Sequence, residues 1–443
     1  MINLFERDTE DSRLLLASLR QAGYDHPTVF LEETGYLPQG VTSPYAFFLA
    51  QTGAKLAGKP LFFNQVPVPA YWEIKGSLSQ AEVANHNQRV ATISYDQTRS
   101  QERLVAKVAW QDANGKVRLV DYYNQYGWCF KHSYYDETGR ELRATYQTDQ
   151  GVEVISEDKL TQTISLTYHK QQYFFKNLVD FTIFFLKEAG YKLDQIWYNS
   201  LSTPMFVATR LGVTGADILF WQEGKRDEVP GNMDYLLHSN PQRPTKICVT
   251  DKEAYAGFAD LFSPADQDSL AYIGYLYNYR RENQARKQAL IMTNSDQIAH
   301  LQELVEQLPN LTFHIAALTE MSPKLMAFAA YDNVKLYPNV NPKQVSQLWQ
   351  LADYYLDINY QNEILRATKQ AFLNQMLILG FNETSHTNKF GLAENRFPVA
   401  AYQDLIAKLD QLLAHDEEVS KEVFLQKQAA EQTSVAYYHE VLG

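Results

Sequence analysis

Short apolar runs alternate with helix-length segments through the second half of the chain. Apolar runs of this length are typical of strands buried on both faces of a sheet. Strands separated by helices pair in parallel through right-handed crossovers, and the runs fall into two groups. The pattern therefore predicts an α/β protein with two Rossmann-like domains. The expected strands are 194–198, 217–221 and 246–250 in the first group, then 289–293, 312–316, 334–337, 354–358 and 376–381 in the second.

The chain between residues 60 and 170 has a different pattern, in which strand-length stretches and turns follow one another. Near its end Ile164, Leu166 and Tyr168 alternate with polar residues, as in a strand with one buried face. Upstream we expect a helix over 8–23, a strand over 28–31 and a further strand over 60–65. We interpret the zone as a β-rich insertion into the first Rossmann-like domain.

A twelve-residue repeat runs through this insertion. Its units are Trp110–Asp112–Gly115, Tyr122–Asn124–Gly127, Tyr134–Asp136–Gly139 and Tyr146–Thr148–Gly151. Asp or Asn opens a type I turn, and glycine takes the positive φ that the bulged end of a hairpin needs. The repeat predicts an antiparallel meander. We expect its aromatics on neighbouring rungs, where they either pack the sheet or form a platform for a sugar, a peptide or a partner protein.

These patterns predict a division into domains. The first Rossmann-like domain comprises 1–59 and 171–280, the meander 60–170 and the second Rossmann-like domain 281–416, and a final helix within 417–443 packs back onto the first domain. The polar segment 278–288 is the expected linker. Ligands of such sheets bind outside the carboxyl ends of the strands, so a cleft between the two domains is the expected site.

Composition excludes several classes of function. A net charge of −12 and a pI near 5.4 argue against nucleic acid, because no basic stripe is available to bind phosphates. Cys129 and Cys248 are the only cysteines, without Cys-x-x-Cys spacing, and the ten histidines show no ligand spacing. We therefore expect a reducing compartment, no Cys-based zinc site, no other metal and no cofactor.

The N-terminus has neither the basic nor the apolar region of a secretion signal, which predicts a cytoplasmic protein. The apolar helix expected over 173–186 is too short and too charged to span a bilayer. We interpret it as a buried helix, with peripheral contact to the cytoplasmic face of the membrane as the alternative.

Familiar catalytic motifs are missing. The segment 53–60 has the glycines and the lysine of a P-loop, but Pro60 stands where a magnesium-binding Ser or Thr belongs, and a strand rather than a helix is expected next. The chain also lacks GxGxxG, GxSxG and HExxH. Hydride transfer, serine hydrolysis and zinc catalysis therefore have no support.

Two Rossmann-like domains and a returning helix resemble the GT-B glycosyltransferase fold. In retaining members, a Glu-x7-Glu segment after a late strand contacts the donor sugar and the nucleotide ribose, and a nearby Arg/Lys pair neutralises the diphosphate. Aligning Gln370-Ala-Phe with the family's Glu-Ala-Met places Asn362 and Gln370 on the two carboxylate positions. An amide lacks the charge assistance of a carboxylate, so the resemblance implies a degenerate donor site. Arg366 and Lys369 could still reach the phosphates, which leaves an active enzyme open.

A closer resemblance covers essentially the whole chain. Trp221-Gln222-Glu223, Pro230-Gly-Asn232, the β-rich insertion and the degenerate donor segment are similar to the stabilising subunit of the two-protein O-linked N-acetylglucosamine transferase that modifies serine-rich repeat adhesins before accessory Sec export. The resemblance implies a non-catalytic chaperone and co-activator that pairs with a catalytic sister subunit and binds the unfolded Ser/Thr-rich acceptor.

This reading assigns roles to particular residues. We expect Trp221, Gln222, Glu223 and Asn232 to bind acceptor, although a tight structural loop would explain them equally well. We expect Tyr122, Tyr134 and Tyr146 to meet the sister subunit at the meander. The alternatives are an active retaining GT-B glycosyltransferase and a carbohydrate-binding protein that stacks glycan on the aromatic repeats.

Overall fold

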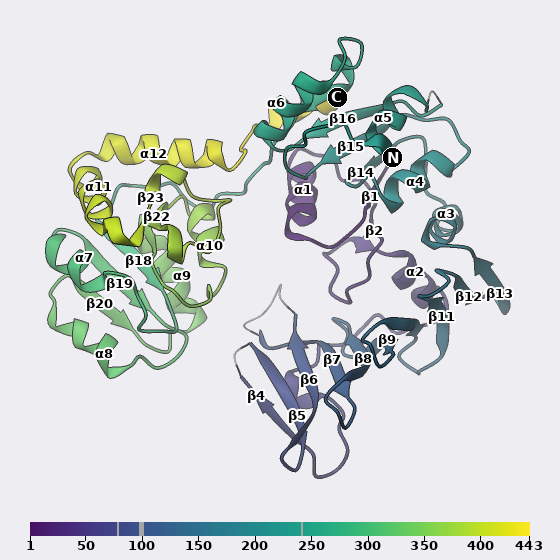
Figure 1. The fold of residues 1–443 in the computed structure, drawn as a ribbon, viewed down its shortest axis with the longest axis horizontal. Coiled ribbons are helices and arrows are strands. Elements are labelled where there is room, and N and C mark those ends of the chain that lie inside the picture. The colour runs from purple at the N-terminus through teal and green to yellow at the C-terminus, as the bar shows by residue number, and fades with distance from the viewer. Residues whose placement is uncertain (78, 97–101, 241) are drawn as a thin grey trace. The chain divides into compact units, whose positions relative to one another are not determined.

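Three sheets organise the described part of the chain, residues 1–77, 79–96, 102–240 and 242–443 of the computed structural model (Figure 1). Two of them belong to a first compact unit, Met1–Ile273 with Val441–Gly443, and the third to a second unit, Gly274–Glu440. Both units contain a parallel sheet with helices, so the expected α/β class with two Rossmann-like folds is confirmed.

The first sheet has seven parallel strands in the order β17-β16-β15-β14-β1-β2-β3. Its strands are β1 (Ile2–Phe5), β2 (Thr28–Phe30), β3 (Val41–Thr42), β14 (Ile196–Tyr198), β15 (Asp217–Trp221), β16 (Thr245–Val249) and β17 (Leu270–Tyr272). Its helices are α1 (Glu10–Gln21), α2 (Pro44–Gln51), α3 (Leu178–Glu188), α4 (Thr203–Arg210), α5 (Gly231–His238) and α6 (Lys252–Leu261). The predicted strands at β14, β15 and β16 are confirmed. The short strand β1 was not predicted, although it lies inside the sheet, between β14 and β2.

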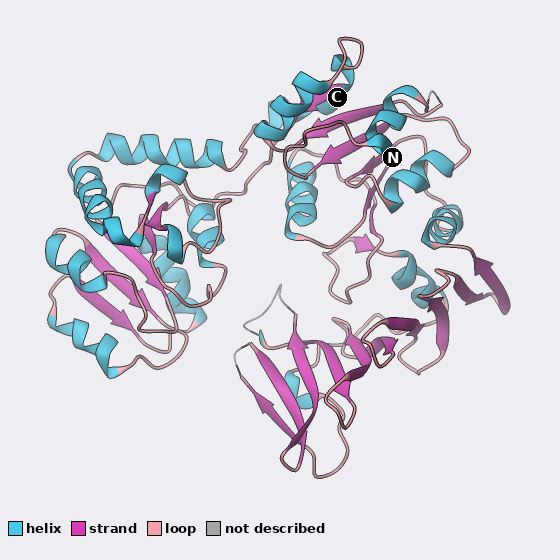
Figure 2. Cartoon of the chain, viewed as in Figure 1, coloured by secondary structure: helices cyan, strands magenta, loops and turns pink. Residues whose placement is uncertain are grey.

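The second sheet has ten antiparallel strands in sequence order, which confirms the meander (Figure 2). They are β4 (Glu73–Gly76), β5 (Gln80–Asn85), β6 (Gln88–Tyr95), β7 (Val105–Gln111), β8 (Val117–Tyr123), β9 (Cys129–Tyr135), β10 (Glu141–Gln147), β11 (Glu153–Asp158), β12 (Ile164–Tyr168) and β13 (Gln171–Phe175). Two expectations at its borders were wrong. Residues 60–65 contain a 3-10 turn, Phe63–Gln65, instead of a strand, and the helix expected over 173–186 begins only at Leu178, because β13 takes the residues before it.

The repeat forms the predicted turns. Gly115, Gly127, Gly139 and Gly151 all have φ between +75° and +88°. In each turn the Asp, Asn or Thr side chain accepts a hydrogen bond from the backbone NH two residues later, for example Asp136 from Thr138 at 2.8 Å and Asn124 from Tyr126 at 3.0 Å. The turn chemistry read from the sequence is therefore confirmed.

The expected pairing of the repeat aromatics on neighbouring rungs was wrong. Trp110 and Tyr134 both pair with Leu119, whereas Tyr122 and Tyr146 both pair with Lys131, on the opposite face of the sheet. Successive strands of a meander run in opposite directions, so aromatics one repeat apart lie at opposite ends of the strands. The Lys131 ammonium instead lies over the Tyr122 ring at 4.7 Å and the Tyr146 ring at 5.4 Å.

One hydrophobic core joins the meander to the first parallel sheet. It includes Leu4 of β1, Phe48 of α2, Tyr146 of β10 and Phe181 of α3. Tyr45 of α2 stacks on Tyr146 with ring centroids 4.2 Å apart, and its hydroxyl hydrogen-bonds Glu157 of β11. The inserted sheet is thus packed on the Rossmann-like fold that carries it.

The second unit contains a six-stranded parallel sheet in the order β20-β19-β18-β21-β22-β23, with helices on both faces (Figure 2). The strands are β18 (Gln288–Met292), β19 (Thr312–Ala316), β20 (Val334–Tyr337), β21 (Tyr354–Asp357), β22 (Leu377–Phe381) and β23 (Arg396–Phe397). The helices are α7 (Leu301–Gln307), α8 (Pro323–Met326), α9 (Pro342–Leu351), α10 (Ala367–Leu373), α11 (Tyr402–Ala414), α12 (Asp416–Ala429) and α13 (Val435–Leu442). All five predicted strands are present. The single final helix expected within 417–443 is two helices, α12 and α13, because the chain turns between them, where Glu431 has a positive φ of 61°.

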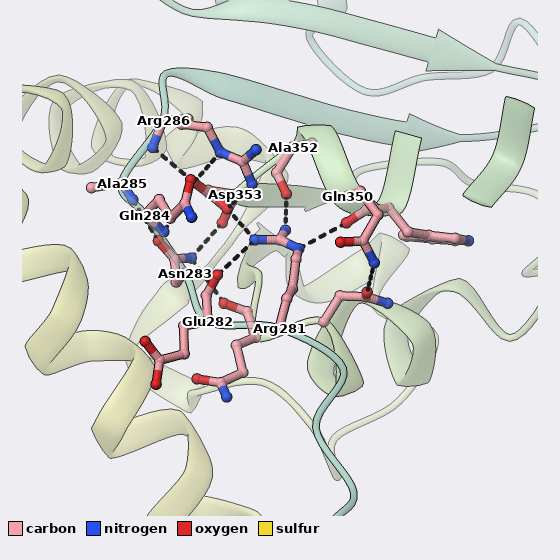
Figure 3. A network of polar contacts seen from close by, with 12 residues as sticks. Arg281, Glu282, Asn283, Gln284, Ala285, Arg286, Gln350, Ala352 and Asp353 are labelled. Atoms are coloured by element: carbon pink, nitrogen blue, oxygen red, sulfur yellow. Dashed lines mark hydrogen bonds and ion pairs between the residues drawn. The ribbon is translucent and has the colours of Figure 1, made fainter. Parts of the chain in front are cut away.

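The polar segment expected as the linker, residues 278–288, makes several contacts within the second unit. Arg281 and Arg286 flank the fully buried carboxylate of Asp353, and Arg286 donates to it at 2.9 and 3.0 Å (Figure 3). The backbone NH groups of Gln284 and Arg286 donate to the same carboxylate. These bonds hold the pKa of Asp353 below its ordinary value although burial acts in the opposite direction. Arg281 and Arg286, which lie in the predicted linker, therefore stabilise the fold of the second unit.

Among the described residues, no helix is long and apolar enough to cross a membrane.

Candidate functional site

The first sheet has a topological switch point between β1 and β14, where the chain order of its strands reverses. Polar side chains fill its carboxyl edge. Asn199 accepts from the backbone NH of Glu6 at 3.1 Å and donates to Gln222 at 3.0 Å, while Ser200 donates to the Glu6 carboxylate. Gln222 also donates to the Asp11 carbonyl at 2.9 Å. Gln222, predicted to bind a ligand, therefore ties β15 to α1 and is committed to the fold.

A hollow of about 710 Å³ opens beside this edge, within the first unit. It is formed by the loop after β14, the end of β15 and the loop that leads into α5. Its polar lining consists of the carboxylates of Glu223, Asp227 and Glu228, the guanidinium of Arg226 and the amide of Asn232. Its other lining residues are Leu201, Trp221, Pro230 and Gly231. Three of the four predicted acceptor residues meet here, and Gln222 is the exception.

Trp221 forms a buried wall of the hollow. Its side chain is 4% exposed, its ring packs edge-on against Phe258 at 5.3 Å, and the Arg226 guanidinium lies over it at 5.8 Å. A ring held in this way offers a fixed apolar surface, but it is also part of the first unit's core.

Glu223 and Asn232 are the accessible members of the set. The Glu223 side chain is 57% exposed and pairs with Arg226, and Asn232 donates to the Leu201 carbonyl at 2.9 Å. Arg226, Asp227 and Glu228 were not predicted. They could have been found from the sequence, because a run of charged residues follows a buried strand and precedes a helix that begins at Pro-Gly. Such a loop lies at the carboxyl end of a parallel strand, where ligands bind.

The three tyrosines predicted for partner binding are not brought together. Tyr146 is 3% exposed and stacked on Tyr45, and Tyr122 is partly buried against the same core. Tyr134 is 41% exposed and lies on the opposite face of the meander. The three side chains therefore cannot form one contact surface.

The predicted degenerate donor segment runs from the loop after β21 into α10 of the second unit. Asn362 is exposed, and the side-chain oxygen of Gln370 accepts from Arg280 at 2.6 Å. Glu363, between them, accepts from the Thr368 backbone NH at 2.7 Å and so caps the start of α10. The one carboxylate in this stretch is thus used by the helix.

The loop before Asn362 is pinned by the protein's own polar groups. Asn359 accepts from Thr293 at 3.0 Å and donates to the Gln361 carbonyl at 3.0 Å. His386 bridges the Asp357 carboxylate at 2.5 Å and the same Gln361 carbonyl at 2.7 Å. Burial opposes protonation of His386, but these partners raise its pKa to about 9. A protonated histidine here ties the ends of β21 and β22 to the loop.

Family comparisons match the chain in four consecutive segments. Residues 2–48 match the GtfB N-terminal domain, 72–176 the GtfB middle domain, 178–261 the GtfB third domain, and 289–428 the C-terminal domain described as GftB/GlyA-F. The GtfB middle domain coincides with the ten-stranded meander.

Full-length relatives agree with these matches. The chain is 39% identical to the UDP-N-acetylglucosamine–peptide N-acetylglucosaminyltransferase stabilizing protein GtfB of Streptococcus agalactiae, over 100% of this chain and 99% of that protein. It is 36% identical to the protein of the same name from Limosilactobacillus reuteri, with the same coverage. A chain in the crystal structure of a GtfA/B complex bound to UDP and GlcNAc superposes with a TM-score of 0.92 at 40% identity, covering 100% of this chain and 99% of that one. The chain therefore belongs to the GtfB family of glycosyltransferase-stabilizing proteins.

Proposed function

We propose that this chain is the non-catalytic, stabilising and acceptor-binding subunit of a protein O-GlcNAc transferase that acts on a Ser/Thr-rich adhesin. It pairs with a catalytic sister subunit and acts as its chaperone and co-activator. The name of the GtfB relatives, which describes them as transferase-stabilizing proteins, and the crystallised GtfA/B complex support this pairing. The assignment as a non-catalytic subunit rests on two amides, Asn362 and Gln370, at the positions where retaining GT-B enzymes use carboxylates. The side chain of Gln370 is also occupied, because it accepts a hydrogen bond from Arg280.

The isolated chain should neither hydrolyse nor transfer from UDP-N-acetylglucosamine. Loss of charged contacts to ribose and sugar weakens binding by about 1.5 to 3 kcal/mol each, and the transition state by more. Turnover by the purified chain that disappears on changing Arg366 or Lys369 would establish the active-enzyme alternative instead.

The hollow beside Trp221 supports acceptor binding. Glu223, Asp227, Glu228 and Asn232 offer oxygens to the hydroxyl and backbone NH groups of an extended Ser/Thr-rich polypeptide, and the Trp221 wall offers apolar contact. An unfolded segment loses conformational freedom on binding, so each site is weak and affinity grows with the number of repeats in one acceptor chain.

A titration with acceptor polypeptides of increasing repeat number tests this site. Glu223→Gln and Asn232→Ala should each weaken binding by roughly tenfold, while Glu188→Gln, an exposed carboxylate at the end of α3, should change nothing. Trp221→Ala is unsuitable, because removing a core indole costs about 3 to 5 kcal/mol in folding. Undetectable peptide binding together with micromolar UDP binding would contradict the proposal.

The meander is the proposed docking site for the sister subunit. Its outer strands β4 and β13 each pair on one side only within the described sheet, and such edges accept a strand from a partner. Phe174 on β13 is 74% exposed, and Tyr134, which is 41% exposed, presents an aromatic ring on a face of the sheet.

Two single variants distinguish a partner that pairs with the edge strand β13 from a partner that covers a face of the meander. Phe174→Ser should abolish co-purification if the partner pairs with β13, and Tyr134→Ser should do so if it covers the face. Tyr360→Ser, with a 49% exposed ring in the second unit, is the control of matched exposure. Complex formation that survives both meander variants would move the interface elsewhere.

We also propose a cytoplasmic location, with peripheral contact to the inner face of the membrane as the alternative. Fractionation of native cells tests it, since a membrane-associated pool released by high salt would favour the peripheral state.

A further inference from the structure

Three potential metal ligands meet on the meander, on the face that bears Trp110 and Tyr134. Asp121 of β8 and His132 of β9 are direct cross-strand partners, and Cys129 lies three residues before His132 on the same strand. The His132 Nδ1 is 2.6 Å from the Asp121 Oδ1 and 3.8 Å from the Cys129 Sγ. All three ligand atoms lie within 4.8 Å of one another.

Neighbouring side chains hold two of the three ligands, Asp121 and His132, from behind. Trp110 Nε1 donates to the second carboxylate oxygen of Asp121 at 2.6 Å, and the Gln147 amide lies 2.9 Å from His132 Nε2. Ligands of metal ions in proteins are usually oriented by such outer hydrogen bonds. The ligands stand on paired strands rather than on loops, so their spacing is fixed by the sheet.

The distances suit a tetrahedral ion. With bonds of about 2.3 Å to sulfur and about 2.0 Å to nitrogen or oxygen, ligand atoms lie roughly 3.3 to 3.6 Å apart. The sulfur–nitrogen distance is already close to this, and the nitrogen–oxygen pair must open by less than about 1 Å. Thiolate, imidazole and carboxylate together favour zinc over magnesium or calcium.

We propose that Asp121, Cys129 and His132 form a zinc site that clamps β8 to β9 in the meander. Among the described residues no fourth His, Cys, Asp or Glu joins the cluster, so water takes the fourth position. The His132 and Asp121 side chains are 24% and 13% exposed, which leaves an entry path.

Binding requires a defined movement of protons. Zinc binds the Cys129 sulfur as a thiolate, so the thiol proton is released to water when the ion binds. The Nδ1 of His132 must give up the proton it shares with Asp121, and the neutral ring then carries its proton on Nε2. Gln147 turns its amide oxygen toward that proton and gives up its hydrogen bond to the Cys129 carbonyl.

We expected no zinc site from the sequence, because that prediction used only the spacing of cysteines and histidines along the chain. Here Cys-x-x-His supplies two ligands and the neighbouring strand supplies the third. Only the register of β8 against β9 brings Asp121 to them.

The test uses the full chain, dialysed against chelator and titrated with zinc and with cobalt. We expect one equivalent of zinc, a thiolate-to-cobalt charge-transfer band, and an apparent Tm that rises with zinc concentration. Cys129→Ala should lose the band and at least tenfold in affinity, whereas Cys248→Ala, the matched cysteine in the parallel sheet, should lose neither. Asp121→Asn should weaken zinc binding with the band retained.

Two results would overturn the site. The first is a wild-type chain that binds no zinc and gives no charge-transfer band with cobalt, a measurement that depends on no variant. The second is a Cys129→Ala chain that still binds one equivalent with unchanged affinity.

Discussion

At the residue scale, the four repeat glycines share one backbone conformation but have different surroundings. A Cβ on Gly127 would lie 2.3 Å from the Lys59 carbonyl oxygen, whereas a Cβ on Gly115 meets nothing within 4 Å. Gly115→Ala should cost about 1 kcal/mol, the strain of positive φ alone, and Gly127→Ala about 3 kcal/mol or more. Urea unfolding of the two variants measures the difference in the free energy of unfolding. Equal losses of stability would mean that the loop around Lys59 moves to make room for the added Cβ.

His386 provides a prediction about pH. Its folded pKa of about 9 lies above the unfolded value near 6.5, so its contribution to stability is fully present below pH 6.5 and lost as the pH rises through 9. His386→Asn should therefore cost about 2 to 3 kcal/mol at pH 6 and much less at pH 9.5. A loss independent of pH would show that the side chain acts through packing rather than through its charge.

At the element scale, one repeat places tyrosines in opposite environments. Tyr146→Ser should cost about 3 kcal/mol or more, because it removes the ring stacked on Tyr45, while Tyr134→Ser should cost less than about 0.5 kcal/mol. Thermal unfolding checks both. A joint replacement of Tyr122, Tyr134 and Tyr146 would confuse misfolding with loss of an interface, so single variants are needed. Similar losses from both single variants would contradict the assigned faces.

At the scale of the whole molecule, each unit contains a buried aspartate that is held by arginine. Asp217 accepts from Arg243 at 2.6 and 2.8 Å beside the first sheet, and Asp353 is held by Arg281 and Arg286 in the second unit. Removing one charge of a buried pair typically costs about 3 to 5 kcal/mol. Asp217→Asn should destabilise only the first unit and Asp353→Asn only the second, as read from hydrogen exchange of each. If either variant lowers protection throughout the chain, the units unfold together.

Local patterns in the sequence determined most of the elements. Strands such as 217–221 and 312–316 consist mostly of apolar residues, and the repeat carries its turn chemistry within six residues, so both can be recognised from local sequence. The sequence also shows directly that Asn362 and Gln370 are uncharged amides, because this depends on residue type and not on the fold. The resemblance to a stabilising subunit rested on these features, and the family comparisons confirm it.

The tertiary structure decided which residues meet. The aromatics fall on two faces because Tyr122 lies three residues after Leu119, the partner of Trp110, and residues an odd number apart on a strand point to opposite faces. Gln222 does not line the hollow, because Asn199 and the Asp11 carbonyl satisfy its amide. The arginines of the expected linker serve Asp353, which lies 67 residues from Arg286. Asp121, Cys129 and His132 converge through strand register. Hydrogen bonds and ion pairs between distant residues depend on register and burial, and a one-dimensional pattern records neither.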